Sequence, residues 1–244
     1  MDSLNRRLFA SLAALVVLAL AAPAAAASPS LEIDELRLAA THAPARSGQA
    51  AGVASPPCAD SAHREFGGTW LKGSYAWAYN ASSTPSYLRR AAVRDVFKKS
   101  FSNITAARND CGLPDNVSAT HTYLGTTNLR ARCNRRDFNN VIGFQRLEPG
   151  VLAVTCFWIS NSRIVEADIQ VNSRERWALT LSGCVAQWML EATMTHEAGH
   201  VFGLDHVGER RHGRLTMSPY LDGPCQLSEA TLGRGDVLGL EALY

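Results

Sequence analysis

The pattern of apolar and polar residues predicts a domain of strands and helices that begins near Gly67. From Arg163 to Val171, mostly polar residues alternate with apolar ones, which is typical of a strand with one buried face. From Tyr87 to Phe101, apolar residues recur three or four positions apart, which predicts an amphipathic helix. Further strands are expected at 74–79, 121–124, 140–144 and 151–159, one long helix at 183–203, and a short final helix at 232–244.

The N-terminal part of the chain has the order of a secretory signal peptide. Two arginines precede an apolar run, Leu8 to Ala22, which is followed by a proline and several alanines. This run is shorter than the ~20 apolar residues that a membrane-spanning helix needs. We therefore expect residues 1–27 to be removed on export, leaving a secreted protein without a membrane anchor. Residues 28–57 are rich in Ala, Ser, Pro and Gly and are expected to form a leader, a linker or a short propeptide before one domain at 58–244.

The net charge argues against binding to nucleic acid or to membranes, and the cysteine count suggests a disulfide-bonded protein. The formal net charge of +2 gives no strong field to attract nucleic acid or an anionic membrane surface. Six cysteines in an exported chain suggest three disulfides, although six cysteines allow 15 pairings and the sequence does not fix which one forms. We expect the pairs Cys111–Cys133 and Cys184–Cys225, with Cys58–Cys156 left by elimination.

The strongest chemical signal is the run His-Glu-Ala-Gly-His-Val-Phe-Gly-Leu-Asp-His at 196–206. Residues four apart on a helix face the same way, so His196 and His200 present two imidazoles to one point. Gly203 can adopt the left-handed conformation that ends a helix, and the chain can then return His206 to that point. Three neutral imidazoles leave a fourth position open on Zn²⁺, as in catalytic zinc sites. Glu197 lies next to His196 and is the candidate general base.

This run resembles the extended zinc-binding motif of the metzincin peptidases and matches it at every fixed position. Metzincins also have a methionine in a turn beneath the metal, and Met217 in Leu-Thr-Met-Ser-Pro-Tyr is similar to it. Within the metzincins, the chain resembles the matrixins, the matrix-metalloproteinase-like branch, over about residues 68–244. The resemblance implies an α/β (α+β) fold with a twisted, mixed five-stranded sheet and three main helices, and it makes 58–244 a catalytic domain. The similar segments are Trp70–Asn80, Ile164–Ile169, the zinc-binding run and Gly235–Tyr244.

Some features depart from the matrixin pattern. The matrixin loop for a second, structural zinc is not visible, because His121 stands alone in that region, and structural Ca²⁺ is possible but not predicted. Cys111-Gly-Leu-Pro-Asp115 looks like the matrixin latency switch, in which a prodomain cysteine occupies the open zinc position. It follows the first expected strand and helix, so we interpret Cys111 as half of a disulfide. Cys58 precedes the domain but lacks the surrounding motif, which leaves the route of latency open.

The sequence therefore predicts a secreted, monomeric zinc endopeptidase with catalytic Zn²⁺ and a polypeptide substrate. Pro219 and Tyr220 follow Met217 and are candidates for a wall of the substrate pocket. The edge strand near 151–159 could hold an extended substrate by strand addition. Two alternatives stay open. One is a catalytically inactive zinc-binding module, against which the presence of Glu197 argues, and the other is a disulfide-stapled structural or adhesive domain without metal.

Overall fold

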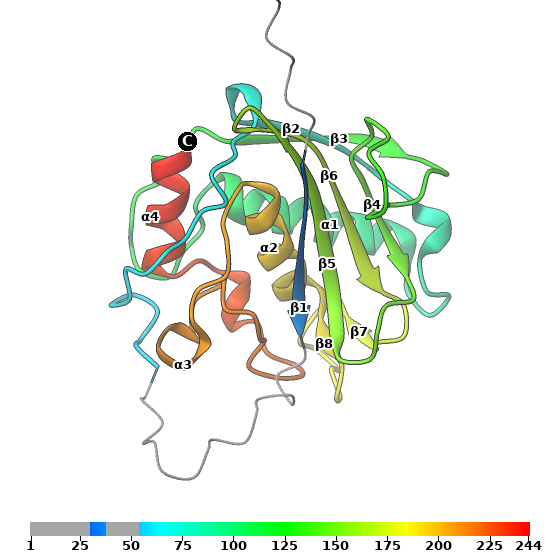
Figure 1. The fold of residues 1–244 in the computed structure, drawn as a ribbon. Helices are drawn as coiled ribbons and strands as arrows, with labels where there is room; N and C mark the ends of the chain where they lie inside the picture. Colours follow the sequence, from blue (N-terminus) through cyan, green and yellow to red (C-terminus); the bar gives the residue numbers. More distant parts are fainter. Residues whose placement is uncertain (1–29, 38–53) are drawn as a thin grey trace, which may run out of the picture.

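The computed structural model describes residues 30–37 and 54–244, so the expected signal peptide at 1–27 lies outside the described residues. Six strands form one sheet in the order β1-β5-β6-β4-β2-β3, and β7 pairs with β8 in a second, two-stranded sheet (Figure 1). The strands are β1 (Ser30–Arg37), β2 (Ser74–Tyr79), β3 (Thr120–Thr126), β4 (Val141–Gln145), β5 (Val151–Ser160), β6 (Arg163–Asn172), β7 (Trp177–Ala178) and β8 (Trp188–Met189).

The five strands β2 to β6 form the mixed sheet that was expected. β2 pairs in parallel with β3 and β4, and β4 pairs in parallel with β6. β5 runs antiparallel to β6 and forms the edge of this five-stranded unit. The leader then adds β1 antiparallel to β5 as a sixth strand, so part of the expected linker belongs to the sheet.

Three main helices accompany the sheet, as expected, with one short additional helix. The helices are α1 (Arg90–Thr105), α2 (Leu190–Val201), α3 (Glu209–His212) and α4 (Arg234–Leu243), with 3-10 turns η2 (Leu71–Gly73), η3 (Ala81–Ser83) and η4 (Ser228–Ala230). Of the helices in the described part of the chain, none has both the length and the apolar character needed to cross a membrane.

An aromatic cluster joins β2 to α1 in the core. Tyr75, Trp77 and Tyr79 alternate along β2 and are all fully buried. On α1, Phe97 and Phe101 lie one helical turn apart, and the rings of Trp77 and Phe101 stack with their centroids 5.1 Å apart. Every second side chain of β2 therefore packs against side chains four residues apart on α1. This aromatic interface fixes α1 against the sheet.

The long helix expected at 183–203 is shorter in the structure, because α2 begins only at Leu190. Cys184 is bonded to Cys225, and the backbone N–H of Cys225 donates to the carbonyl of Gln187 at 2.8 Å. Trp188 then pairs with Trp177 as part of β8 and β7. These nonlocal contacts hold 184–189 in a non-helical path that ends in β8, which the helical spacing of apolar residues did not reveal.

The polar face of β6 is buried, whereas alternation predicted that it would face solvent. Glu166 and Asp168 are both fully buried beneath the loop between β3 and β4. Asp168 accepts hydrogen bonds from the backbone N–H groups of Arg132 at 2.5 Å and Val141 at 2.6 Å, and Glu166 accepts from that of Asp137 at 3.0 Å. Burial raises the pKa of Asp168 to about 8, and it also raises that of Glu166. The two carboxyl groups thus fasten the loop to the sheet.

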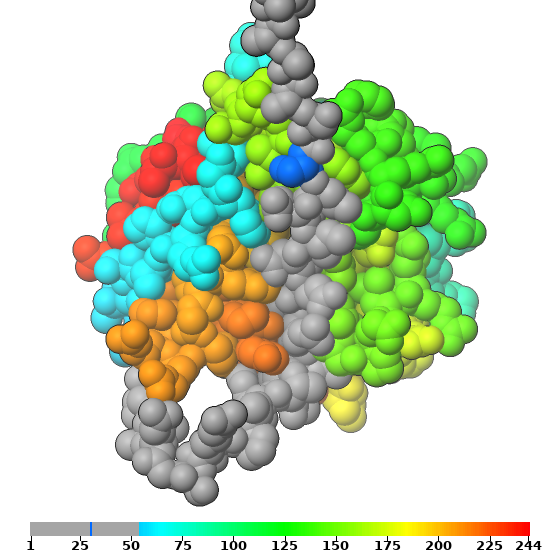
Figure 2. Space-filling model, viewed as in Figure 1, coloured from blue at the N-terminus to red at the C-terminus, as the bar shows by residue number. Residues whose placement is uncertain are grey.

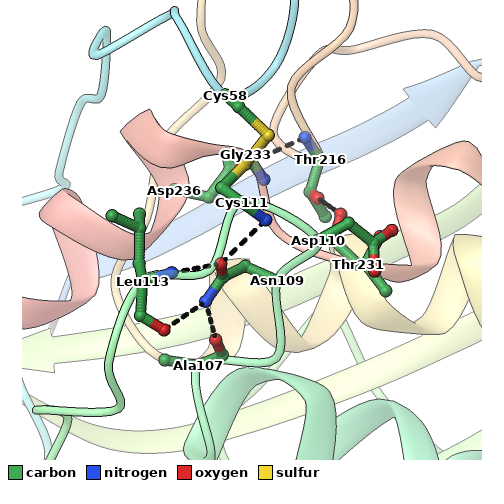
Figure 3. Close-up of a disulfide and its surroundings, with 10 residues drawn as sticks. All are labelled: Cys58, Ala107, Asn109, Asp110, Cys111, Leu113, Thr216, Thr231, Gly233 and Asp236. Atoms are coloured by element: carbon green, nitrogen blue, oxygen red, sulfur yellow. Dashed lines mark hydrogen bonds between the residues drawn. A yellow bond between two sulfur atoms is a disulfide. The ribbon is translucent and has the colours of Figure 1, made fainter.

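Two of the three expected disulfides are wrong. The structure contains Cys58–Cys111 and Cys133–Cys156 in place of Cys111–Cys133 and Cys58–Cys156, whereas Cys184–Cys225 forms as expected. Spacing along the chain could not rank these pairings. The loop that carries Cys133 lies over β5 and reaches Cys156, and the segment before η2 runs beside the turn after α1 (Figure 3).

Candidate functional site

Helix α2 carries the first two candidate zinc ligands. His196 and His200 lie one helical turn apart on its buried face, and both side chains are fully buried. Their Nε2 atoms are 2.8 Å apart. The i, i+4 spacing therefore brings the two imidazoles to one point, as the sequence predicted.

The third histidine reaches the same point because the chain turns sharply after α2. Gly203 has a φ of +92°, a conformation that favours glycine. A Cβ at this position would lie only 2.6 Å from the carbonyl oxygen of Gly68, so the packing also excludes a side chain. Beyond the turn, the Nε2 atom of His206 lies 3.0 Å from that of His196 and 3.2 Å from that of His200.

Backbone carbonyl groups orient two of the imidazoles. Nδ1 of His196 lies 2.7 Å from the carbonyl oxygen of Thr216, and Nδ1 of His200 lies 2.8 Å from that of Leu204. A carbonyl oxygen can only accept, so each Nδ1 must carry the proton and donate it. The Nε2 lone pairs of both rings are then available at the point where the three histidines meet.

The geometry and the charge state of this triad fit a zinc ion. Zinc–nitrogen bonds of about 2.0–2.1 Å at tetrahedral angles separate ligand nitrogens by about 3.3–3.4 Å, close to the distances above. Burial, together with the neighbouring His200 and His206, lowers the pKa of His196 well below its usual value, which keeps the ring neutral. Among the residues that the structure describes, these three histidines are the one group of His, Cys, Asp or Glu side chains with metal-ligand spacing.

Met217 lies directly beneath α2. A Cβ built on Gly199 would come within 2.4 Å of the Met217 sulfur, so the absence of a side chain at Gly199 makes room for the methionine. The carbonyl of Met217 accepts a hydrogen bond from the backbone N–H of Val207 at 3.0 Å. The turn thus packs against the helix between the first two histidines and also fixes the chain just after His206.

Asp236 of α4 holds this turn from the other side, a role that sequence reasoning missed. Its carboxylate accepts hydrogen bonds from the backbone N–H groups of Thr216 at 2.9 Å, Met217 at 3.2 Å and Gly233 at 2.8 Å. Burial raises the pKa of Asp236 to about 6. Because the Thr216 carbonyl orients His196, Asp236 supports this candidate ligand through the turn. The available signal was an acidic residue in the first turn of the final helix, where such residues cap backbone N–H groups.

Thr155 of β5 contacts the candidate general base, and this residue was also missed. Both Thr155 and Glu197 are fully buried. The Thr155 hydroxyl donates to the Glu197 carboxylate, and its oxygen also lies 3.3 Å from the Glu197 carbonyl oxygen. No local sequence signal marks this threonine, because the contact joins a strand to a helix 42 residues later.

Three residues that neighbour His206 or Met217 in the sequence lie in different settings. Asp205 accepts a hydrogen bond from the backbone N–H of His206 at 2.7 Å and forms an ion pair with Arg64 at 2.9 Å, so it braces the third histidine. Pro219 and Tyr220 lie two and three residues after Met217 and are half-buried. Their part in a substrate pocket stays a prediction.

Comparison with known proteins gave one family match. The sequence model of the family described as Matrixin matches residues 69–244. This range contains the three histidines, Glu197, Thr155 and the turn through Met217, and it begins after the segment that carries β1. Among curated proteins, no sequence matched the chain.

Proposed function

Because the chain belongs to the matrixin family, we propose that it is a secreted zinc endopeptidase that hydrolyses polypeptides at the His196, His200 and His206 site. The observation that carries this proposal is the convergence of three Nε2 atoms beside a buried carboxylate, Glu197. A binding module would need the imidazoles but would have no use for the carboxylate. A purely structural domain would need neither.

The residues of the site divide the work of hydrolysis between them. When bound, zinc lowers the pKa of a coordinated water to about 7 and polarises the substrate carbonyl. His196, His200 and His206 would hold the ion through their Nε2 atoms and leave one side open. Glu197 accepts a proton from the attacking water and delivers it to the leaving amine, so no covalent intermediate with the protein is needed.

Substrate binding is proposed at the edge of β5. This strand forms the rim of the five-stranded sheet and carries Thr155, whose hydroxyl contacts Glu197. An extended peptide that adds to this edge would pass the catalytic carboxylate in a regular ladder. Backbone hydrogen bonds would give affinity, and pockets for alternate side chains would give the cleavage preference.

Metal removal tests the proposal. The purified protein should contain one zinc ion per chain and cleave members of a peptide library. A chelator should abolish cleavage, and added Zn²⁺ should restore the same cleavage pattern. A protein that binds zinc stoichiometrically but cuts no peptide would be the inactive binding module. A protein without zinc, whose unfolding temperature is the same in chelator, would be the structural domain.

Replacing Thr155 by valine removes the hydroxyl at nearly constant volume and should impair the positioning of Glu197. We expect kcat to fall about tenfold, equivalent to about 1.4 kcal/mol, with little change in KM or zinc content. Thr155→Ser keeps the hydroxyl and should restore most of kcat. Steady-state kinetics of both variants measure this effect. Equal losses in the valine and serine variants would show that packing, not the hydroxyl, matters at this position.

A further inference from the structure

We propose that the leader strand β1 is a self-inhibitory strand, which occupies the edge of β5 where a peptide substrate would pair. This inference rests on the proposed peptidase function and adds its regulation. The strand lies in the part of the chain before the family match, so nothing in the matrixin match accounts for its position.

The pairing of β1 with β5 is long and regular. It runs antiparallel from the pair Ser30 and Ile159 to the pair Leu36 and Ala153, and a shift in register follows only at Arg37. The other edge of β5 is already paired with β6. β1 therefore takes the one edge of β5 that could accept an extended peptide (Figure 1).

The register also places β1 beside the reaction centre. Asp34 is the partner of Thr155, the residue whose hydroxyl contacts the Glu197 carboxylate. Some Cα atoms of β1 also lie within 8 Å of Cα atoms of α2. Helix α2 carries two of the three histidines. A substrate that needs this stretch of β5 to reach Glu197 would have to displace β1 first.

Within the described residues, no thiol is available to hold the site closed. Cys111, whose surroundings look like the matrixin latency switch, is bonded to Cys58, and the other four cysteines are paired as well. In β1 the backbone holds the strand in place, through the hydrogen bonds of its antiparallel ladder with β5. Covalent attachment to the domain adds an effective concentration in the millimolar range, so even a short strand can compete with a dilute substrate.

The Cys58–Cys111 disulfide anchors the start of the domain independently of β1. Cys58–Cys111 fastens the start of the domain near Gly233, and the backbone N–H of Arg234 donates to the carbonyl of Pro57 at 2.9 Å (Figure 3). In Figure 2 this cyan segment lies against the orange region after α2, where the backbone N–H of Ser55 donates to the carbonyl of Arg211 at 3.1 Å. One cut between β1 and residue 54 would release the inhibitory strand and leave this segment in place.

Breaking the β1 pairing in the full-length secreted chain tests the proposal. Ile33→Pro removes a backbone N–H and is disfavoured within a strand, whereas Ser47→Pro, outside β1, is the matched control. Hydrogen exchange of the amides at 151–160 reports whether the edge of β5 is covered, independently of activity. We expect Ile33→Pro to lose protection there and to gain about tenfold or more in kcat/KM, with the control unchanged. A synthetic peptide of residues 30–37 should inhibit the Ile33→Pro variant competitively.

The outcomes separate this proposal from the function on which it rests. Equal protection of β5 in wild type and Ile33→Pro would overturn the pairing. Loss of protection without a gain in cleavage, in a chain that does cleave peptides, would overturn the inhibitory role. Loss of protection in a zinc-loaded chain that cleaves nothing would refute the peptidase function, and the inhibitory role with it. If Ile33→Pro fails to fold, a protease recognition sequence can be inserted next to Gly48 in the wild-type chain. Cutting the folded protein once at this sequence then allows the same two measurements, the protection of β5 and the rate of peptide cleavage.

Discussion

Replacing Glu197 by glutamine should lower kcat/KM by about 10²- to 10⁴-fold, the range that general acid–base groups contribute. Glutamine keeps the size of the side chain, but its amide cannot accept a proton from the attacking water. The three imidazoles remain, so zinc content and the unfolding temperature should change little. Kinetics with a fluorogenic peptide, together with metal analysis of the same preparation, measure both effects.

Glu191 provides a control on the same helix. Its carboxylate is also buried, but it contacts Lys99 at 2.7 Å and Asn103 at 3.2 Å, away from the histidine triad. Glu191→Gln should therefore leave kcat/KM almost unchanged. Undiminished cleavage by Glu197→Gln would refute the assigned role of Glu197. Loss of zinc from Glu197→Gln would show that this carboxylate supports the metal rather than the proton transfer.

Replacing Gly203 by alanine should destabilise the protein by about 2–5 kcal/mol and weaken zinc binding. A left-handed residue with a Cβ costs about 1–2 kcal/mol, and overpacking costs about 1–3 kcal/mol more. Both terms apply here, because φ is +92° and the new Cβ would meet the Gly68 carbonyl oxygen at 2.6 Å. To avoid this contact, the backbone at Gly203 must shift, and this shift also moves His206, which follows three residues later. Chemical denaturation and competition with a zinc chelator measure the two effects.

Gly208 is the matched glycine in the same loop. Its φ is −73°, and the nearest atom to an added Cβ lies 3.9 Å away, on His212. Gly208→Ala should change the free energy of unfolding by less than about 1 kcal/mol and leave zinc affinity intact. Similar effects in the two variants would mean that the turn at Gly203 is not what positions His206.

The triad was predictable because its geometry is local. His196 and His200 follow from helical spacing, and Gly203 supplies a turn whose conformation glycine permits. Even His206 is only six residues from His200, so short-range rules bring all three together. The mixed sheet and the three main helices followed from the matrixin resemblance of segments such as Gly235–Tyr244.

The errors share one physical origin, which is contact between segments far apart in the chain. The helix expected at 183–203 begins only at Leu190, because the Cys184–Cys225 disulfide and the pairing of β8 with β7 hold the preceding residues in a non-helical path. The polar residues of β6 suggested a solvent-facing side, but the loop between β3 and β4 covers them. Alternation records the chemistry of a side chain, and it does not record which loop will fold over it.

The sequence by itself determined the candidate metal site of this protein, because three imidazoles and a carboxylate are placed by one helix and one turn. Only the tertiary structure decided which residues surround that centre. Thr155 reaches Glu197 from a strand 42 residues earlier, Asp236 holds the turn below His196, and β1 lies along β5. These contacts depend on pairing between distant segments, whose free energy is set by the whole packed domain and not by any window of the sequence.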